Sequence, residues 1–284
     1  MCRQQVRGFL NDLGIASSCI MLSLMFARQK RKAPNTADVV NRAIILKNIF
    51  VKGMANPPAD WLVEQTKIWK PEESESFFAE SRRWSELQKK KLQDSGLWKQ
   101  MDGSERAFIK ASPLEITIRM RIDSAWLAES IVCLLWAVGF ITDLPPYDQQ
   151  SNPELTNMLP NERATERALL RPMQAIEKQR GIAETWHWRS RTRQLQESGR
   201  MPKVLTGGIT VEEILRLSAS RAAQEGYFSV PIDGDFAALG KAYRDLTSEE
   251  FASLTSIAQE RHEAFNWLCG YAPDNRWADT PTDT

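Results

Sequence analysis

Apolar residues recur every three or four positions along most of this chain, which is the spacing that places them on one face of a helix. The first clear case spans residues 37–52, where Thr36 is the expected N-cap and Gly53 the glycine that ends the helix. Its apolar stripe consists of Val39, Ala43, Leu46 and Phe50. The pattern predicts an amphipathic helix packed against a core.

Two more helices follow in the sequence. Residues 60–70 form a helix that ends before Pro71, because proline cannot continue a helix interior. Residues 73–93 form a longer helix. Its expected inward side chains are Phe77, Phe78, Trp84 and Leu87. The lysines at 89–91 are expected in solvent or near the helix end, where positive charge is favourable.

The central block is the most apolar part of the chain. Residues 112–115 read Ser-Pro-Leu-Glu, a helix start, and Asp123 is the expected cap of the following stretch, SAWLAESIVCLLWAVG. Apolar residues lie nearly all round this stretch, which predicts a buried helix. Its expected buried side chains include Trp126, Leu134, Leu135 and Trp136. Glu129 lies inside it and needs a partner, either an arginine or the groups of a functional cleft.

Helix signals continue to the end of the chain. A long helix is predicted over residues 172–197, and Thr210 and Thr247 each begin another with a glutamate three residues later. The last helix is expected to end at Gly270. Residues 227–232 are the only stretch that favours a strand.

These patterns predict an all-α protein, a single compact multi-helix domain over residues 34–284 with about nine to twelve helices. Ten tryptophans predict a Trp-rich core. Residues 1–33 are interpreted as an N-terminal extension, such as an upstream start-site assignment would add, with Met25 as an alternative start. The uncharged run at 13–27 is shorter than a membrane-spanning helix and lacks a signal-peptide cleavage site.

The net charge and the cysteine positions argue against several classes of function. Lys and Arg total 37 and Asp and Glu 36, so the net charge is +1 and gives no general attraction to nucleic acid or anionic membranes. The four cysteines are far apart and form no zinc-binding spacing, which favours free thiols in the cytoplasm. No phosphate-binding loop and no nucleophile elbow is present. We therefore expect no cofactor and no metal.

Four stretches resemble a known family. They read NTADVVNRAIILK, SAWLAESIVCLLWAVGFITDLPPYD, TWHWRSRTRQL and ERHEAFNWLCGY with the closing RWADTPTDT. Together they resemble the bacterial domain of unknown function family 4272 over about residues 34–284, with the closing pattern as the most specific part. That family has no assigned activity, so the resemblance implies a fold and no mechanism.

The chain has only two histidines, His187 and His262. The sequence His262-Glu-Ala-Phe-Asn266 resembles the H-E-x-x-H zinc motif, but asparagine replaces the second histidine, so the motif predicts no zinc. His262 is interpreted as a histidine at the edge of the core. A run of tryptophans and arginines around His187 and Arg189 could bind nucleic acid, but Trp186 and Trp188 point about 200° apart on a helix and cannot form one stacking platform.

The end of the chain holds the other candidate residues. Arg261 is expected to pair with a carboxylate such as Glu129 or Asp279, and it is the first choice of donor to Asp279. Trp277 is expected to pack near Trp267. Asn266 is expected to bond the tail backbone. A ligand pocket lined by His187, Arg261, His262 and Trp277 is the alternative. The complete set of ligand-binding candidates is His187, Arg189, Arg261, His262, Asn266, Trp277 and Asp279.

Two functions remain open on the sequence alone. The favoured one is a non-catalytic cytosolic bacterial protein that binds another protein as an adaptor or in a protective role, because no catalytic constellation is recognisable. The alternative is an enzyme or small-ligand binder with a pocket around His187, Arg261 and His262. No nucleic-acid or membrane partner is expected, and self-association is left open.

Overall fold

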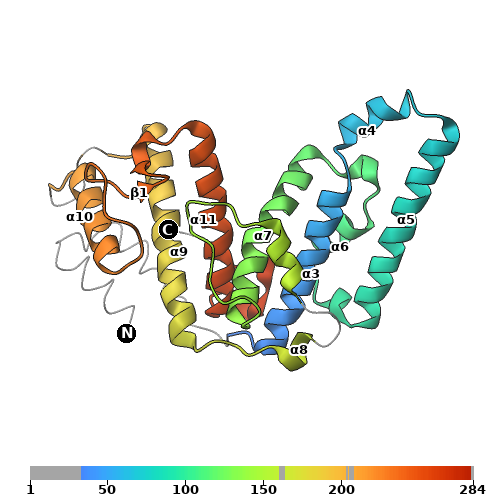
Figure 1. Cartoon of the computed structure of the whole chain (residues 1–284), viewed down its shortest axis with the longest axis horizontal. Helices are drawn as coiled ribbons and strands as arrows, with labels where there is room; N and C mark the ends of the chain where they lie inside the picture. The colour runs from blue at the N-terminus through green and yellow to red at the C-terminus, as the bar shows by residue number, and fades with distance from the viewer. Residues whose placement is uncertain (1–32, 160–163, 203, 205–207, 283–284) are drawn as a thin grey trace. The chain divides into compact units, whose positions relative to one another are not determined.

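The fold is all-α, as the sequence predicts (Figure 1). This computed structural model describes residues 33–159, 164–202, 204 and 208–282. The only strands assigned among them are β1 (Ala237–Ala238) and β2 (Lys241–Ala242), which pair antiparallel. The α-helices of these residues are α3 (Thr36–Ala55), α4 (Ala59–Thr66), α5 (Pro71–Asp94), α6 (Gly103–Lys110), α7 (Ile118–Ala137), α8 (Ala164–Arg167), α9 (Met173–Glu197), α10 (Val211–Gln224) and α11 (Ser248–Leu268).

The chain divides into two compact units. Unit 2 contains Asn35–Leu144 and Ser151–Leu170, and unit 1 contains Pro145–Gln150 and Arg171–Thr284. A single domain over residues 34–284 stays a prediction. Residues 1–32 of the predicted extension lie outside the described residues.

Helices α3 and α7 form the centre of unit 2. Gly53 lies inside α3, two residues before its end, and so does not terminate it as predicted. A Cβ atom at this position would lie 1.7 Å from Oγ of Ser124 on α7. The glycine therefore serves close helix packing, and its presence places the end of α3 beside the beginning of α7.

Two helix starts differ from the prediction. Asn35, and not Thr36, caps α3: its side chain accepts the backbone N–H of Asp38 at 3.0 Å. Helix α7 begins at Ile118 with Thr117 as its cap, so Asp123 lies inside the helix. Asp123 instead forms an exposed ion pair with Arg119 at 2.9 Å. More than one polar residue near each helix start could act as the N-cap, and the spacing of apolar residues does not show which one does.

The apolar end of α7 is buried, as predicted. Leu134 and Leu135 have no exposed surface and Trp136 is 7% exposed, whereas Trp126 is half-buried. Glu129 is also fully buried, and it accepts hydrogen bonds from both the backbone N–H and the hydroxyl of Ser151, at 2.6 and 2.8 Å. These bonds partly offset the cost of burying the carboxylate.

Replacing Trp136 by alanine should lower the free energy of unfolding by about 3–5 kcal/mol, because a large buried aromatic side chain leaves a cavity. Trp61, which is 47% exposed in α4, provides the matched control, and its replacement by alanine should cost less than about 1 kcal/mol. Urea unfolding followed by far-UV circular dichroism measures both. Equal losses in the two variants would contradict the assignment of Trp136 to the core.

A fully buried lysine ties α3 to the other segments of unit 2. The ammonium of Lys52 donates to Ser85 Oγ at 2.8 Å and to the carbonyl oxygens of Ile109 and Ala111, both at 2.7 Å. Burial lowers the pKa of Lys52 to about 8, while the charge of Glu115 opposes this shift. The three acceptors match the three donors of an ammonium group, so Lys52 is a structural cation.

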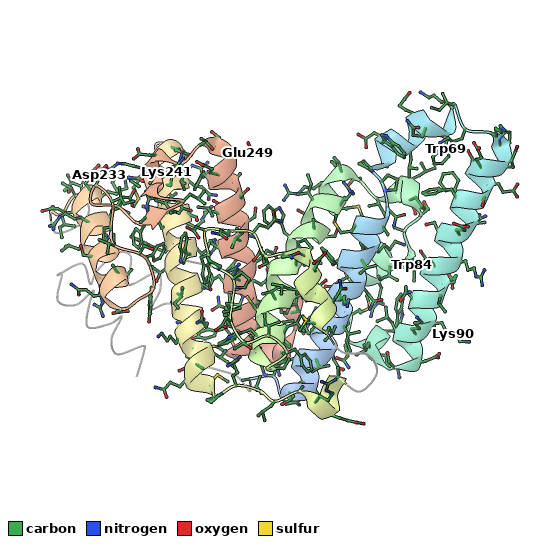
Figure 2. All side chains as sticks on the ribbon, in the orientation of Figure 1. Trp69, Trp84, Lys90, Asp233, Lys241 and Glu249 are labelled. Atoms are coloured by element: carbon green, nitrogen blue, oxygen red, sulfur yellow. The ribbon has the colours of Figure 1, made fainter. Side chains whose placement is uncertain are left out.

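Helix α5 is long and mostly exposed. Only Ser85 and Leu92 are buried in it, and Phe77, Phe78 and Trp84 are half-buried. Figure 2 shows Trp84 on the side of α5 that faces α3, where the Lys52 ammonium lies 5.8 Å from its ring centre. The prediction that Leu87 points inward is wrong, because its side chain is 48% exposed.

Unit 1 is built on the antiparallel packing of α9 and α11, which lie side by side in Figure 1. Thr210 and Thr247 cap α10 and α11 through the predicted capping boxes. Gly270 follows α11 with a positive φ of 73°, as expected for a helix-ending glycine. The predicted strand at 227–232 is wrong, because Ile232 makes only an isolated bridge with Asp235.

Aromatic side chains contribute to the core as predicted, but unequally. Among the tryptophans, Trp61 is exposed and five others are half-buried. The buried tryptophans are Trp136, Trp186, Trp267 and Trp277. Three of these four lie in unit 1, where the candidate functional residues also lie.

Candidate functional site

The two histidines meet between α9 and α11. Nδ1 of His187 lies 3.0 Å from Nδ1 of His262, and the ring centres are 5.2 Å apart. His187 is 4% exposed and His262 1% exposed. The sequence placed each on a helix but could not show that they form a pair.

The neighbours of His262 fix its tautomer. The side-chain nitrogen of Asn266 donates to the carbonyl oxygen of Pro281 at 2.7 Å, which identifies this atom as the amide nitrogen. The same nitrogen lies 3.0 Å from Nε2 of His262, so Nε2 accepts a hydrogen bond and carries no proton. His262 is therefore protonated on Nδ1 and donates to Nδ1 of His187. Asn266 bonds the tail backbone, as predicted.

The environment of His262 opposes a positive charge. Burial, the neighbouring His187 and the charge of Arg180 lower the pKa of His262 well below its ordinary value of 6.5. Arg180 belongs to the same network, because its guanidinium lies 3.5 Å from Oδ1 of Asn266. A protonated His262 would lose its bond from Asn266, since both would then be donors.

Unit 1 should lose stability as the pH falls below about 6.5. The unfolded chain takes up a proton at His262 in this range while the folded chain does not, so acid favours unfolding by up to about 1.4 kcal/mol per pH unit. Chemical denaturation at several pH values should give a steeper acid loss for the native protein than for His262→Gln. If the free energy of unfolding fell with pH equally in the two proteins, the result would contradict the lowered pKa of His262.

Arg261 precedes His262 on α11 and ends a column of aromatic rings. Its guanidinium donates to the carbonyl oxygen of Pro145 at 2.7 Å and lies 4.6 Å from the ring centre of Tyr147. Tyr147 stacks on Trp186, which stacks on Phe228, at centre-to-centre distances of 5.6 and 4.0 Å. Arg261 is fully buried, so it holds the 145–150 segment against α9 and α11.

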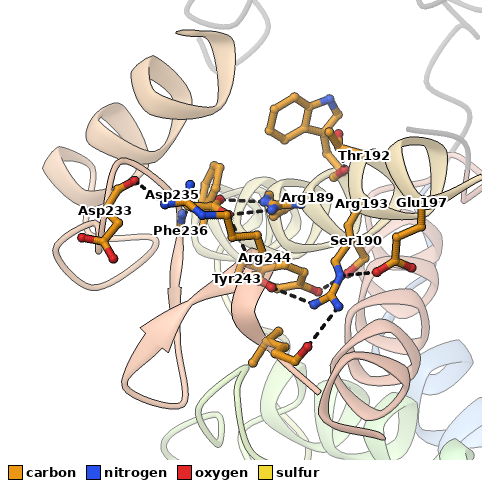
Figure 3. Close-up of polar contacts among 12 residues, drawn as sticks. Arg189, Ser190, Thr192, Arg193, Glu197, Asp233, Asp235, Phe236, Tyr243 and Arg244 are labelled. Atoms are coloured by element: carbon orange, nitrogen blue, oxygen red, sulfur yellow. Dashed lines mark hydrogen bonds and ion pairs between the residues drawn. The ribbon is translucent and has the colours of Figure 1, made fainter. Parts of the chain in front are cut away.

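Arg189, two residues after His187 on α9, makes a separate buried ion pair. Its Nε and Nη2 donate to the two carboxylate oxygens of Asp235 at 2.8 and 2.6 Å (Figure 3). The guanidinium also lies 4.7 Å from the ring centre of Tyr243. Both partners are at most 1% exposed. Sequence reasoning missed Asp235, whose only signal was its place in the Asp-Gly-Asp turn at 233–235.

Asp235 stays ionised in this place. Burial raises its pKa, but the hydrogen bonds and charge of Arg189 outweigh burial, and so the pKa lies below the ordinary value. The backbone N–H groups of Phe236 and Arg244 also donate to the carboxylate, at 2.8 and 3.0 Å. Asp235 thus connects α9 to the β1–β2 hairpin region of unit 1.

The tail residues dock as predicted, with one correction. Trp277 is 7% exposed and lies 5.4 Å from Trp267, measured between ring centres. Asp279 is exposed and pairs with Arg276 at 3.3 Å, not with Arg261, because the two are three residues apart in one turn. Asp279 is therefore a surface residue.

The candidates form neighbouring networks within unit 1. His187, His262 and Asn266 form one network, Arg189 belongs to a second, and Trp277 packs on the end of α11. His187, Arg261 and His262 are each under 5% exposed, an arrangement that suits architecture better than substrate binding. In the described part of the chain, no three His, Cys, Asp or Glu side chains converge as metal ligands.

No helix among the described residues has both the length and the apolar character needed to cross a membrane.

Comparison with protein-family models matches the domain of unknown function DUF4272 over residues 2–214. The chain belongs to this family. The DUF4272 match includes His187 and Arg189, but Arg261, His262, Asn266, Trp277 and Asp279 follow its last residue. It also includes most of the predicted N-terminal extension. The closing pattern that carried much of the resemblance thus lies outside the part of this DUF4272 protein that the family model covers.

Searches among curated proteins and among solved structures found no match to this DUF4272 protein.

Proposed function

We propose that this chain is a non-catalytic protein-binding domain of the bacterial cytoplasm, acting as an adaptor or in a protective role. The observation that carries the proposal is a concentration of exposed apolar side chains at one end of unit 2. We call this surface the apolar end of unit 2. Its residues are Val51, Met54, Trp61, Val63, Ile68, Leu114, Ile118 and Ile122, all at least 36% exposed.

These residues come from segments that meet. The end of α3 lies beside the beginning of α7 through Gly53 and Ser124, and α4 packs beside the short turn at 113–115 (Figure 1). Trp61 also contacts Trp69, with ring centres 6.3 Å apart. Single exposed apolar residues are normal on a protein surface, but a group of them from adjoining segments favours a binding surface.

The buried polar residues of unit 1 also support a non-catalytic role. The buried charged and imidazole groups of unit 1 bond to one another or to the backbone, as Arg189 does with Asp235 and His262 with Asn266. Groups used in this way hold the fold together, and a catalytic role would require them to exchange partners with a substrate. Protein binding through an apolar surface requires no such exchange.

A comparative pull-down tests the proposal. The native protein and a Trp61→Ser/Ile68→Asp variant are used as bait in a bacterial lysate, and captured proteins are identified by mass spectrometry. Val230→Asp is the matched control, because Val230 is 79% exposed but lies in unit 1. We expect a partner that the native protein and the control capture and the variant does not.

Equal capture by all three proteins, or capture of nothing by any of them, would contradict the proposal. Unchanged melting temperatures in both variants establish that the substitutions act on binding and not on folding, as expected for exposed positions.

A further inference from the structure

One exposed face of α5 carries residues at alternating intervals of three and four, the spacing of a helix–helix seam. We call these residues the α5 stripe: Glu73, Ser76, Glu80, Arg83, Leu87 and Lys90. All are exposed. Among the described residues, the side chain of Glu73 accepts the backbone N–H of Lys70 at 3.0 Å, within the same turn. The stripe faces away from Ser85 and Leu92, the buried residues of α5.

Charge is segregated along the stripe. Its first half is acidic, with Glu73 and Glu80 seven residues apart, and its second half is basic, with Arg83 and Lys90 also seven residues apart. Because the two spacings are equal, the stripe is complementary to itself when reversed. Glu73 then lies opposite Lys90, and Glu80 lies opposite Arg83.

We propose that the α5 stripe binds the α5 stripe of a second copy of this chain, in antiparallel orientation. The two-fold axis passes between Ser81 and Arg82, so each contact occurs twice, as a symmetric dimer requires. This arrangement forms two Glu73–Lys90 and two Glu80–Arg83 ion pairs. The inference is independent of the apolar end of unit 2 and goes beyond the proposed function.

The charges of the α5 stripe favour the antiparallel orientation over the parallel one. A parallel pair would place each residue opposite its own copy, which brings like charges together along the whole stripe. The antiparallel pair also aligns the two helix dipoles favourably, with the start of each helix near the end of the other. Leu87 lies opposite Ser76 in this register and supplies the apolar contact.

The interaction is weak and salt-sensitive. Exposed ion pairs each contribute little and are screened by salt, and Leu87 is the only large apolar residue of the stripe. Dimers should therefore form at high protein concentration and low ionic strength, and should dissociate when salt is added.

Sedimentation velocity of the full chain tests the proposal at about 10 µM to about 500 µM protein, in about 20 mM and about 500 mM salt. Glu73→Lys/Glu80→Lys and Arg83→Glu/Lys90→Glu should each raise the dissociation constant at least about tenfold, because all charges on the stripe then have one sign. A one-to-one mixture of the two variants, and the variant with all four changes, should dimerise again.

Glu75→Lys/Arg82→Glu is the control, because these exposed residues lie on the flank of α5 and should leave dimerisation unchanged. Far-UV circular dichroism verifies that every variant keeps its helix content. A native protein that is monomeric at the highest concentration and lowest salt would overturn the proposal. A dimer that persists in both charge-reversal variants would also overturn it, since the contact would then lie elsewhere.

Discussion

Replacement of Arg189 by methionine should lower the free energy of unfolding by about 3–5 kcal/mol. The change leaves the carboxylate of Asp235 buried without the cation that neutralises it, at a site where both partners are at most 1% exposed. Denaturant unfolding of the native protein and of Arg189→Met measures the loss. The variant should recover part of its stability in mild acid, because an unpaired buried carboxylate takes up a proton readily.

The double variant Arg189→Met/Asp235→Asn is the control for this prediction. It removes both charges but keeps a side-chain oxygen that can accept the backbone N–H of Phe236 or Arg244. It should therefore be more stable than Arg189→Met alone. A double variant that is less stable than the single one would show that packing around Arg189, and not the unpaired charge, causes the loss.

Replacement of Trp277 by alanine should cost about 3–5 kcal/mol and lower the melting temperature by about 10 °C. The indole is 7% exposed and packs on Trp267, and the tail is also held by two hydrogen bonds: Trp267 Nε1 donates to Asn275 O and Asn266 to Pro281 O. Deletion of residues 275–284 should destabilise unit 1 in the same direction, with faster amide exchange at the end of α11.

Asp279→Asn is the matched substitution in the same tail. Asp279 is exposed and its ion pair with Arg276 is solvent-accessible, so this change should cost less than about 1 kcal/mol. If Trp277→Ala and Asp279→Asn had equal and small effects, the docked tail would contribute nothing to stability.

The sequence predicts the helices of this protein well because their signals are local. The capping boxes at Thr210 and Thr247 require only residues within one turn, and the structure confirms both. Gly53 was assigned wrongly because a glycine near a helix end has two explanations, a terminus or a close approach. Only the position of Ser124, far along the chain, decides between them.

The candidate site was only partly predictable for the same reason. Composition drew attention to His187 and His262 because there are no other histidines, but their contact depends on the antiparallel packing of α9 and α11. Asp235 was missed because an aspartate in a turn is usually explained by the turn itself. Leu87 was placed inside because helix periodicity locates an apolar residue on a face without showing which face is covered.

The division of the chain into two units implies an order in which they can fold during translation. Every residue of unit 2 precedes Arg171, so this unit has its complete sequence while the ribosome is still adding α9, α10 and α11. Unit 1 differs, because contacts such as the bond from Asn266 to Pro281 need residues that follow all of unit 2 in the sequence. Limited proteolysis of stalled nascent chains should therefore find unit 2 protected before unit 1.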